Sequence, residues 1–268
     1  MQITKDNYFS NEASKEYMGV SLFKSFLPKY GGCEAKTMAK INDEWQEPDN
    51  PAFLLGSYVH AWNEGNLQEF ISQNPALFKK NGELYAKYAI GDDMINTLKN
   101  DPVAMKALEG QKEIIMTGEL FGFPWKIMID SYNPKAGAFT DLKTSREINK
   151  TYWNEYTREK ENFITHWGYD WQMAVYAEIE RQNRDSDEYL NPHILAVSKE
   201  TPPDKELIVF DEDMDSFVED TLNLMESDVP RVFEVWKGNT EPRRCGVCKY
   251  CRETKKITMP VHYMEVGL

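Results

Sequence analysis

A short predicted hairpin carries acidic and basic side chains at spacings that could do chemistry. In FTDLKTS, residues 139–145, Asp141 and Lys143 lie two apart, so a strand would point both side chains to the same side. The predicted turn NPKAG would place Asp130 directly opposite Asp141. Two opposed carboxylates, with Cβ atoms about 4.5–5.5 Å apart, repel each other unless a cation lies between them. Oxygen ligands of this kind suit Mg²⁺ or Mn²⁺. Lys143 would then orient an attacking water or stabilise a phosphorane-like transition state.

The four cysteines form a second candidate site. Cys245, Cys248 and Cys251 make the pattern C-x-x-C-x-x-C, and Cys33 lies far away in the N-terminal part. In a chain expected to be cytoplasmic, this spacing is typical of metal binding rather than of disulfides. Three interpretations are open: a 4Fe-4S cluster closed by Cys33, a tetrahedral Zn²⁺ site, or reduced thiols without metal. Any metal here would be structural and would hold the basic segment 243–256 against the N-terminal helices.

The elements that must position these residues follow from hydrophobic periodicity and turn residues. Residues 1–110 are predicted to be helical, with helices near 21–27, 33–41, 51–65, 92–99 and 101–108. Strands are predicted at 113–120, 123–132, 137–144, 193–200 and 206–210, with helices at 167–181 and 213–237. This order predicts an α/β fold with a mixed central β-sheet flanked by helices. We expect one domain over residues 1–268, made of a helical part (1–110), a catalytic sheet core (111–210) and a C-terminal helix and cysteine segment (211–268).

The charge is unevenly distributed along the chain. A net charge of −13 over 268 residues argues at first against a nucleic-acid partner. However, eight acidic residues and no basic one fall between 211 and 228, whereas segment 243–256 holds six basic residues and one acidic residue. That segment could face a polyanion or be a solvated surface. No run of 18 apolar residues occurs and the N-terminus is too polar for a signal peptide, so we expect a cytoplasmic protein without a membrane partner.

Four motifs, taken in order, resemble those of the PD-(D/E)XK nuclease superfamily, and within it the phage-type exonucleases similar to RecE (exodeoxyribonuclease VIII). They are GSYVH ending at His60, MID ending at Asp130, DLK at 141–143 and QMAVY at 172–176. The resemblance covers most of the chain. It implies a restriction-endonuclease-like core around the predicted sheet.

The resemblance also assigns roles to single residues. The divalent metal would be bound by three side chains and one backbone carbonyl: His60, Asp130, Asp141 and Leu142. Lys143 would be the catalytic lysine. Gln172 and Tyr176 lie four apart on one helix face, where they would contact the DNA backbone or orient Lys143. Glu113 lies near a glutamate of the relatives and is equally explained as a solvated strand end.

The cysteines are similar to those of AddB-type and CRISPR-associated nucleases of the same superfamily. There, one N-terminal and three C-terminal cysteines staple the chain ends around an iron-sulfur cluster. In this sequence only two residues separate Cys248 from Cys251, where those families have a longer gap.

The function implied is a Mg²⁺-dependent exodeoxyribonuclease that hydrolyses phosphodiester bonds from double-stranded DNA ends, as in phage-type recombination. Ring-shaped relatives suggest a homo-oligomer with the acidic stretch 211–228 outside, and a single-strand annealing recombinase would be its partner. The alternative is a non-catalytic DNA-end or partner-binding module stapled by its four-cysteine metal site. A metallohydrolase of another class is disfavoured because the chain has no H-E-x-x-H motif.

Overall fold

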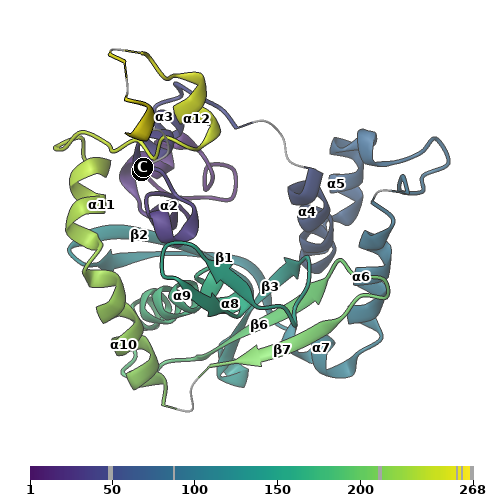
Figure 1. Ribbon diagram of the computed structural model, residues 1–268. Helices are drawn as coiled ribbons and strands as arrows, with labels where there is room; N and C mark the ends of the chain where they lie inside the picture. Colours follow the sequence, from purple (N-terminus) through teal and green to yellow (C-terminus); the bar gives the residue numbers. More distant parts are fainter. Residues whose placement is uncertain (48–50, 87, 211–212, 258, 261, 266–268) are drawn as a thin grey trace.

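The computed structural model describes residues 1–47, 51–86, 88–210, 213–257, 259–260 and 262–265. Its centre is a five-stranded sheet in the order β1-β2-β3-β6-β7 (Figure 1). The strands are β1 (Gln111–Leu120), β2 (Phe123–Asn133), β3 (Ala138–Ser145), β6 (Asn191–Ser198) and β7 (Lys205–Val209). Only the β3–β6 pair is parallel within this sheet. The predicted mixed α/β fold is therefore confirmed.

The hairpin between β2 and β3 has the register predicted from its turn. Ser131 pairs with Thr140, and the pairing continues to Asn133 and Ala138. A 3₁₀ turn over Pro134–Ala136 closes it, followed by Gly137 in the left-handed region at φ 72°. Asp130 and Asp141 form the next position along, where the pairing ends and β3 stays paired only with β6. The hairpin therefore opens at its two aspartates.

Helices cover both faces of the sheet. The first core contains Phe139, Ile194 and Ala196, and α9 (Tyr169–Arg184) packs there with α2 (Val20–Ser25), α10 (Met214–Glu226) and α11 (Val229–Trp236). The second core contains the alternate residues Leu142 and Leu195 under α4 (Pro51–Glu64), α6 (Ile90–Lys99) and α7 (Pro102–Ala107). This alternation is the period of two expected of strands buried on both faces. Figure 1 shows the two helical groups on opposite sides of the molecule.

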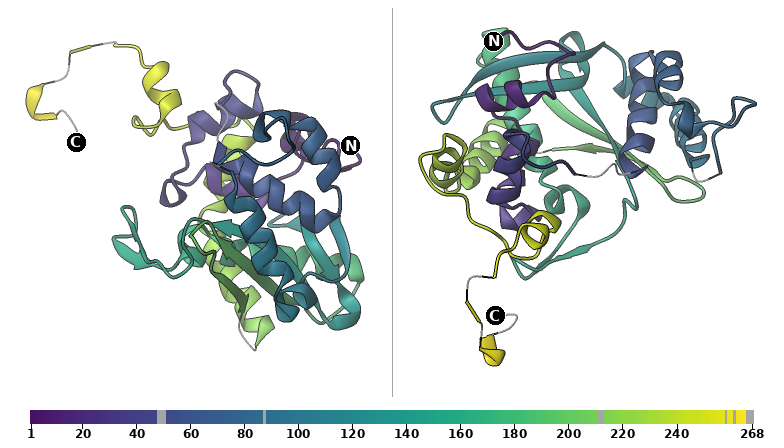
Figure 2. Two further views of the ribbon diagram at one scale, coloured as in Figure 1. Left: turned by 90° about the vertical axis from the view of Figure 1, so that its right-hand side faces the viewer. Right: turned by 90° about the horizontal axis from the view of Figure 1, so that it is seen from above.

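Shorter elements complete the described chain. The helices are α1 (Asn11–Glu16), α3 (Glu34–Ile41), α5 (Leu67–Gln73), α8 (Phe163–His166) and α12 (Lys249–Glu253). The strands β4 (Tyr152–Asn154) and β5 (Glu159–Glu161) form a separate hairpin, and Figure 2 shows it standing out from the body. Among the described residues no helix is long and apolar enough to cross a bilayer.

The single helix predicted over 213–237 is wrong. α10 ends at Glu226 and α11 begins at Val229. Pro230 lies in the first turn of α11, where its missing N–H costs no hydrogen bond, whereas inside a continuous helix it would break one.

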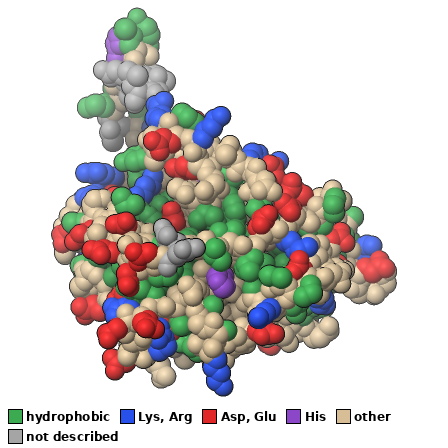
Figure 3. All heavy atoms as spheres, turned by 90° about the horizontal axis from the view of Figure 1, so that it is seen from below, with side chains coloured by type: hydrophobic (Ala, Val, Ile, Leu, Met, Phe, Trp, Pro, Cys, Tyr) green, Lys and Arg blue, Asp and Glu red, His purple; other side chains and the backbone are tan. Residues whose placement is uncertain are grey.

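Acidic side chains gather on the outer face of α10. Asp215, Glu219, Asp220 and Glu226 are exposed, whereas Val218 on the opposite face is buried. Figure 3 shows acidic side chains concentrated at the left of the view, the side on which α10 lies in Figure 1. Residues 211 and 212 of the predicted acidic stretch lie outside the described residues.

Candidate functional site

Two carboxylates lie at the open end of the β2–β3 hairpin. Asp130 is 8% exposed and Asp141 is 3% exposed. The Leu142 N–H, which has no strand partner on this edge, donates to Asp130 Oδ2 at 2.7 Å. Because the N–H and C=O of a strand residue point to the same side, the Leu142 carbonyl lies on this edge too. The edge therefore gathers acidic oxygens and one backbone carbonyl.

Lys143 extends the same edge. Its Nζ lies 2.6 Å from Asp141 Oδ2 and 4.6 Å from the ring centroid of Tyr169. Burial lowers the pKa of Lys143, but Asp141, Tyr169 and Asp130 together outweigh burial, so the pKa is raised overall. Burial raises the pKa of Asp141, and the Lys143 ammonium only partly opposes that rise. Lys143 is therefore a cation held against the carboxylate.

One oxygen of this pair is left without a hydrogen bond. Asp141 Oδ2 is fully buried and accepts no hydrogen bond from the described part of the chain, but the Lys143 ammonium lies 2.6 Å away. A buried anionic oxygen without a hydrogen bond is costly unless a cation neutralises it, and Lys143 supplies that charge here.

His60 reaches Asp130 from α4. Its Nδ1 lies 3.6 Å from Asp130 Oδ1. Burial lowers the pKa of His60, but the Asp130 carboxylate outweighs it, so the pKa is raised. The approach depends on Gly56, because a Cβ there would lie 3.1 Å from Thr144 Oγ1 of β3. Gly56 thus lets α4 lie close enough to the sheet for His60 to reach the aspartates.

Gln172 and Tyr176 lie behind the carboxylates rather than on the surface. Gln172 Nε2 donates to Asp141 Oδ1 at 2.7 Å. Tyr176 is buried, and burial raises its pKa well above the usual range. Of the two roles expected for Gln172 and Tyr176, contact with a DNA backbone does not fit, because both side chains are buried. Gln172 instead fixes the orientation of Asp141.

The open end of the β2–β3 hairpin borders a cleft of about 880 Å³. His60, Asp130, Leu142 and Lys143 line it. Four further residues that line the cleft were not predicted from the sequence: Lys5, Phe9, Glu64 and Tyr169.

Glu64 and Glu113 form a second carboxylate pair in this cleft. Burial raises the pKa of Glu64 to about 7, and the adjacent Glu113 adds to the rise. Glu113 lies in β1 with a positive φ of 50° and pairs with Lys5 at 2.5 Å. Glu113 is therefore a cleft residue, not a solvated strand end. Glu64 follows His60 by four residues, which places both on one helix face and could have identified it.

The donor set fits a hard divalent cation. Carboxylate oxygens from Asp130 and Asp141, the imidazole of His60 and the Leu142 carbonyl surround the open end of the hairpin. Asp141 Oδ2, which has no hydrogen bond and lies beside the Lys143 ammonium, would be a ligand oxygen for such an ion.

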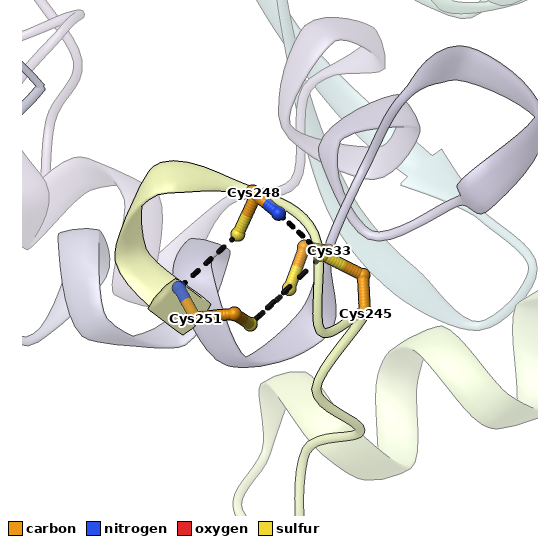
Figure 4. Close-up of side chains that lie close together, drawn as sticks. All are labelled: Cys33, Cys245, Cys248 and Cys251. Carbon is orange, nitrogen blue, oxygen red and sulfur yellow. Dashed lines mark hydrogen bonds between the residues drawn. The ribbon is translucent and has the colours of Figure 1, made fainter. Parts of the chain in front are cut away.

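The four cysteines meet at the other end of the molecule (Figure 4). Their Sγ atoms all lie within 4.8 Å of one another. The Sγ of Cys33 is 3.6 Å from that of Cys251, which lies 3.9 Å from Cys245 Sγ. Cys248 caps α12 by accepting the Cys251 N–H. Burial raises the pKa of Cys245, but the backbone N–H groups of Cys248 and Val247 outweigh it and lower the pKa to about 6. The predicted gathering of Cys33 with the C-terminal cysteines is present.

An ion pair supports this cysteine site. Arg231 of α11 donates two hydrogen bonds to the Glu34 carboxylate of α3, at 3.0 and 2.6 Å. Glu34 Oε2 also accepts the Arg243 N–H at 2.6 Å, and the Ala35 N–H donates to the Arg243 carbonyl. The C-terminal segment is thereby fixed to α3 immediately after Cys33.

A solved structure shares this architecture. A crystal structure from Eubacterium rectale, provisionally described as an exonuclease, is 40% identical over 100% of this chain and 98% of that chain, with a TM-score of 0.90. The structure of SSO0001 is 12% identical over 92% of this chain and 94% of that chain; its TM-score of 0.39 is too low to support any argument. No protein with a curated description matches the chain. The family described as "PDDEXK-like domain of unknown function (DUF3799)" matches residues 19–254. The chain therefore belongs to this PDDEXK-like family.

Proposed function

We propose that this chain is a metal-dependent DNA exonuclease that hydrolyses phosphodiester bonds from duplex ends, with a RecE-like role in phage-type recombination. One observation carries the proposal: the buried Asp141 Oδ2, without a hydrogen bond, lies beside Lys143 on the edge shared with Asp130. The provisional description of the Eubacterium rectale protein supports the choice of an exonuclease.

Four residues would hold the metal: His60, Asp130, Asp141 and, through its carbonyl, Leu142. Mg²⁺ or Mn²⁺ bound there would supply polarisation of a phosphoryl oxygen and a lower pKa for a bound water. Glu64 and Glu113 line the same cleft and would offer further oxygen ligands.

Lys143 would act as a cation rather than as a base. Its pKa is raised by Asp141, so it keeps its proton and donates hydrogen bonds to the attacking water and to the phosphate oxygens on which charge develops. The side-chain amide of Gln172 would hold Asp141 by its Oδ1, so that Asp141 Oδ2 points away from Gln172.

The sulfur spacing favours a single tetrahedral ion at the cysteine site. Zn–S bonds of about 2.3 Å in a tetrahedron place sulfur atoms about 3.8 Å apart. The separations from Cys251 to Cys33 and to Cys245, 3.6 and 3.9 Å, are close to that value, and all four sulfur atoms lie within 4.8 Å of one another. A 4Fe-4S cluster binds each thiolate to a different iron and spreads the sulfur atoms further apart. Metal analysis of anaerobically purified protein tests this: one colourless Zn²⁺ per chain is expected, whereas iron with inorganic sulfide would show a cluster.

The exposed acidic face of α10 suits a ring-shaped homo-oligomer in which that face lies outside and the clefts face the DNA. The single strands produced by such an exonuclease would be the substrate of a single-strand annealing recombinase.

An assay with linear and closed-circular duplex DNA tests the proposed activity. With Mg²⁺ or Mn²⁺ we expect the linear DNA alone to be degraded, and EDTA or Lys143→Ala to abolish degradation. Lys135→Ala, which changes an exposed lysine in the β2–β3 turn, is the matched control. If the folded protein binds DNA ends and leaves linear DNA intact under every condition, the chain is the non-catalytic binding module instead.

A further inference from the structure

A second cavity lies beside the catalytic cleft, on the far side of Tyr169. Its volume is about 290 Å³, and Tyr169 lines both spaces. Its other side chains are hydroxylic, aromatic or basic: Ser21, Lys24, Ser25, Tyr30, Lys36 and Trp167. No acidic side chain lines this cavity among the described residues, although the chain has a net charge of −13. The lining is therefore suited to an anion.

Lys24 is the least compensated charge in this cavity. Its Nζ donates to the carbonyls of Trp167 and Gly168, and it lies 5.3 Å from the ring centroid of Tyr169. Within the described ranges no carboxylate comes within ion-pair distance of it. Burial lowers the pKa of Lys24 to about 7 and the Lys143 charge adds to that effect, while the Asp170 and Asp141 carboxylates only partly oppose it. A sheltered ammonium without a carboxylate at ion-pair distance is stabilised when an anion binds beside it.

The local fold holds this lysine in place. Gly168 has a positive φ of 60°, and a Cβ there would lie 2.8 Å from both Lys24 Cδ and Tyr30 Cζ. The chain that leads into α9 therefore passes directly over Lys24. Lys36 reaches the cavity from α3, and its nearest carboxylate oxygen, in Glu47, is 4.0 Å away.

We propose that this cavity binds an internal phosphodiester of the DNA strand whose scissile phosphate occupies the catalytic cleft. The inference rests on the proposed function, because it follows the same strand past Tyr169. Lys143 and Lys24 lie over the same Tyr169 ring, at 4.6 and 5.3 Å from its centroid, so one strand can meet both ammonium groups. Trp167 is 46% exposed at the rim and offers a face for base stacking.

Binding without hydrolysis tests this subsite. A fluorescein-labelled single strand of about 20 nucleotides without terminal phosphates would be titrated in EDTA, with anisotropy read over a series of salt concentrations. We expect Lys36→Gln and Lys24→Gln each to weaken affinity about 3–10-fold and to reduce the slope of log K against log salt by about 0.7. Lys135→Gln should bind like wild type, since Lys135 lies on the exposed turn between β2 and β3.

The outcomes separate this subsite from the nuclease activity. If the two variants bind more weakly and the wild-type chain never hydrolyses DNA, the subsite is supported and the proposed exonuclease activity is contradicted. Unchanged affinity and salt slope in both variants, while wild type hydrolyses DNA, would overturn the subsite alone. A requirement for a 5′-terminal phosphate would overturn the assignment to an internal phosphodiester. Melting temperatures control for folding, and Lys36→Gln keeps the test valid if Lys24→Gln, which loses two carbonyl contacts, unfolds.

Discussion

The cleft at the β2–β3 hairpin and the cysteine site both collect side chains of types that bind metals, but the chain builds them in opposite ways. Asp130 and Asp141 belong to one hairpin, whose strand register places them together. Cys33 and Cys251 are 218 residues apart and meet only through packing of the short helices α3 and α12. Among the described residues, the buried cluster there consists of Cys33, Ala35 and Cys251. We therefore expect the cleft to form without an ion, and the cysteine site to gain stability from one.

Asp141→Asn should have the largest effect on activity. It removes the negative charge that Asp141 would contribute to the divalent ion, so hydrolysis of linear duplex should fall by about 10³-fold or more, because the metal supplies several kcal/mol. The melting temperature should fall as well, because Lys143 loses the carboxylate with which it pairs, so rates are compared at a temperature where both proteins are folded. Initial rates in Mg²⁺ measure the effect, with Asp93→Asn on the exposed side of α6 as control. A wild-type rate in Asp141→Asn would remove Asp141 from the site.

Cys251→Ser should affect stability more than activity. Loss of the cross-link between the chain ends should lower the melting temperature by roughly 5–15 °C, since cross-links of this kind contribute about 2–5 kcal/mol. Hydrolysis by the folded protein at low temperature should fall far less than in Asp141→Asn. Val247→Ser, in the same segment but exposed, is the control. Equal melting temperatures in the two variants, in metal-loaded protein, would show that the cysteines hold no stabilising ion.

Gln172→Leu tests whether packing behind the cleft matters to its chemistry. The variant loses the hydrogen bond that orients Asp141, so activity should fall about 10–100-fold and more Mg²⁺ should be needed for half-maximal rate. Gln68→Leu on the exposed side of α5 is the matched change. If the rate falls but the Mg²⁺ concentration needed for half-maximal rate stays that of wild type, Gln172 does not position Asp141 for the metal.

Glu34→Gln should give the smallest change. It weakens the pair with Arg231 beside Cys33, which is worth about 1 kcal/mol, so the melting temperature should fall by roughly 2–4 °C. A chelator should also remove the cysteine-bound metal faster. Glu44→Gln, exposed near the end of α3, is the control. Equal rates of metal release in both variants would show that this ion pair does not hold the site closed.

The sequence allowed the fold class and the hairpin register to be predicted because both depend on local patterns. Alternating polar and apolar residues and the turn NPKAG set the pairing of Ser131 with Thr140. The break between α10 and α11 was also local, since Pro230 marks it, but the apolar periodicity on either side hid it.

The cleft walls were harder to predict because they come from distant segments. Lys5 and Phe9 reach the cleft through tertiary packing, which no spacing in the sequence encodes. The place of Glu113 in the cleft goes with a left-handed backbone conformation in β1, which its residue type does not favour. The burial of Gln172 follows from the packing of α9 on the sheet, which also determines what that side chain can touch.

A metal ion at the cysteine site would also lower the conformational entropy of the unfolded chain. An ion held by Cys33 and Cys251 closes a loop of 218 residues that contains the whole sheet. The entropy lost on closing a loop grows with the logarithm of its length, so an unfolded chain that keeps its ion has far fewer conformations than an open one. Such an ion would therefore stabilise the protein partly by restricting its unfolded state. During synthesis this ring can close only after the last strand has left the ribosome, because Cys251 is made after all of them.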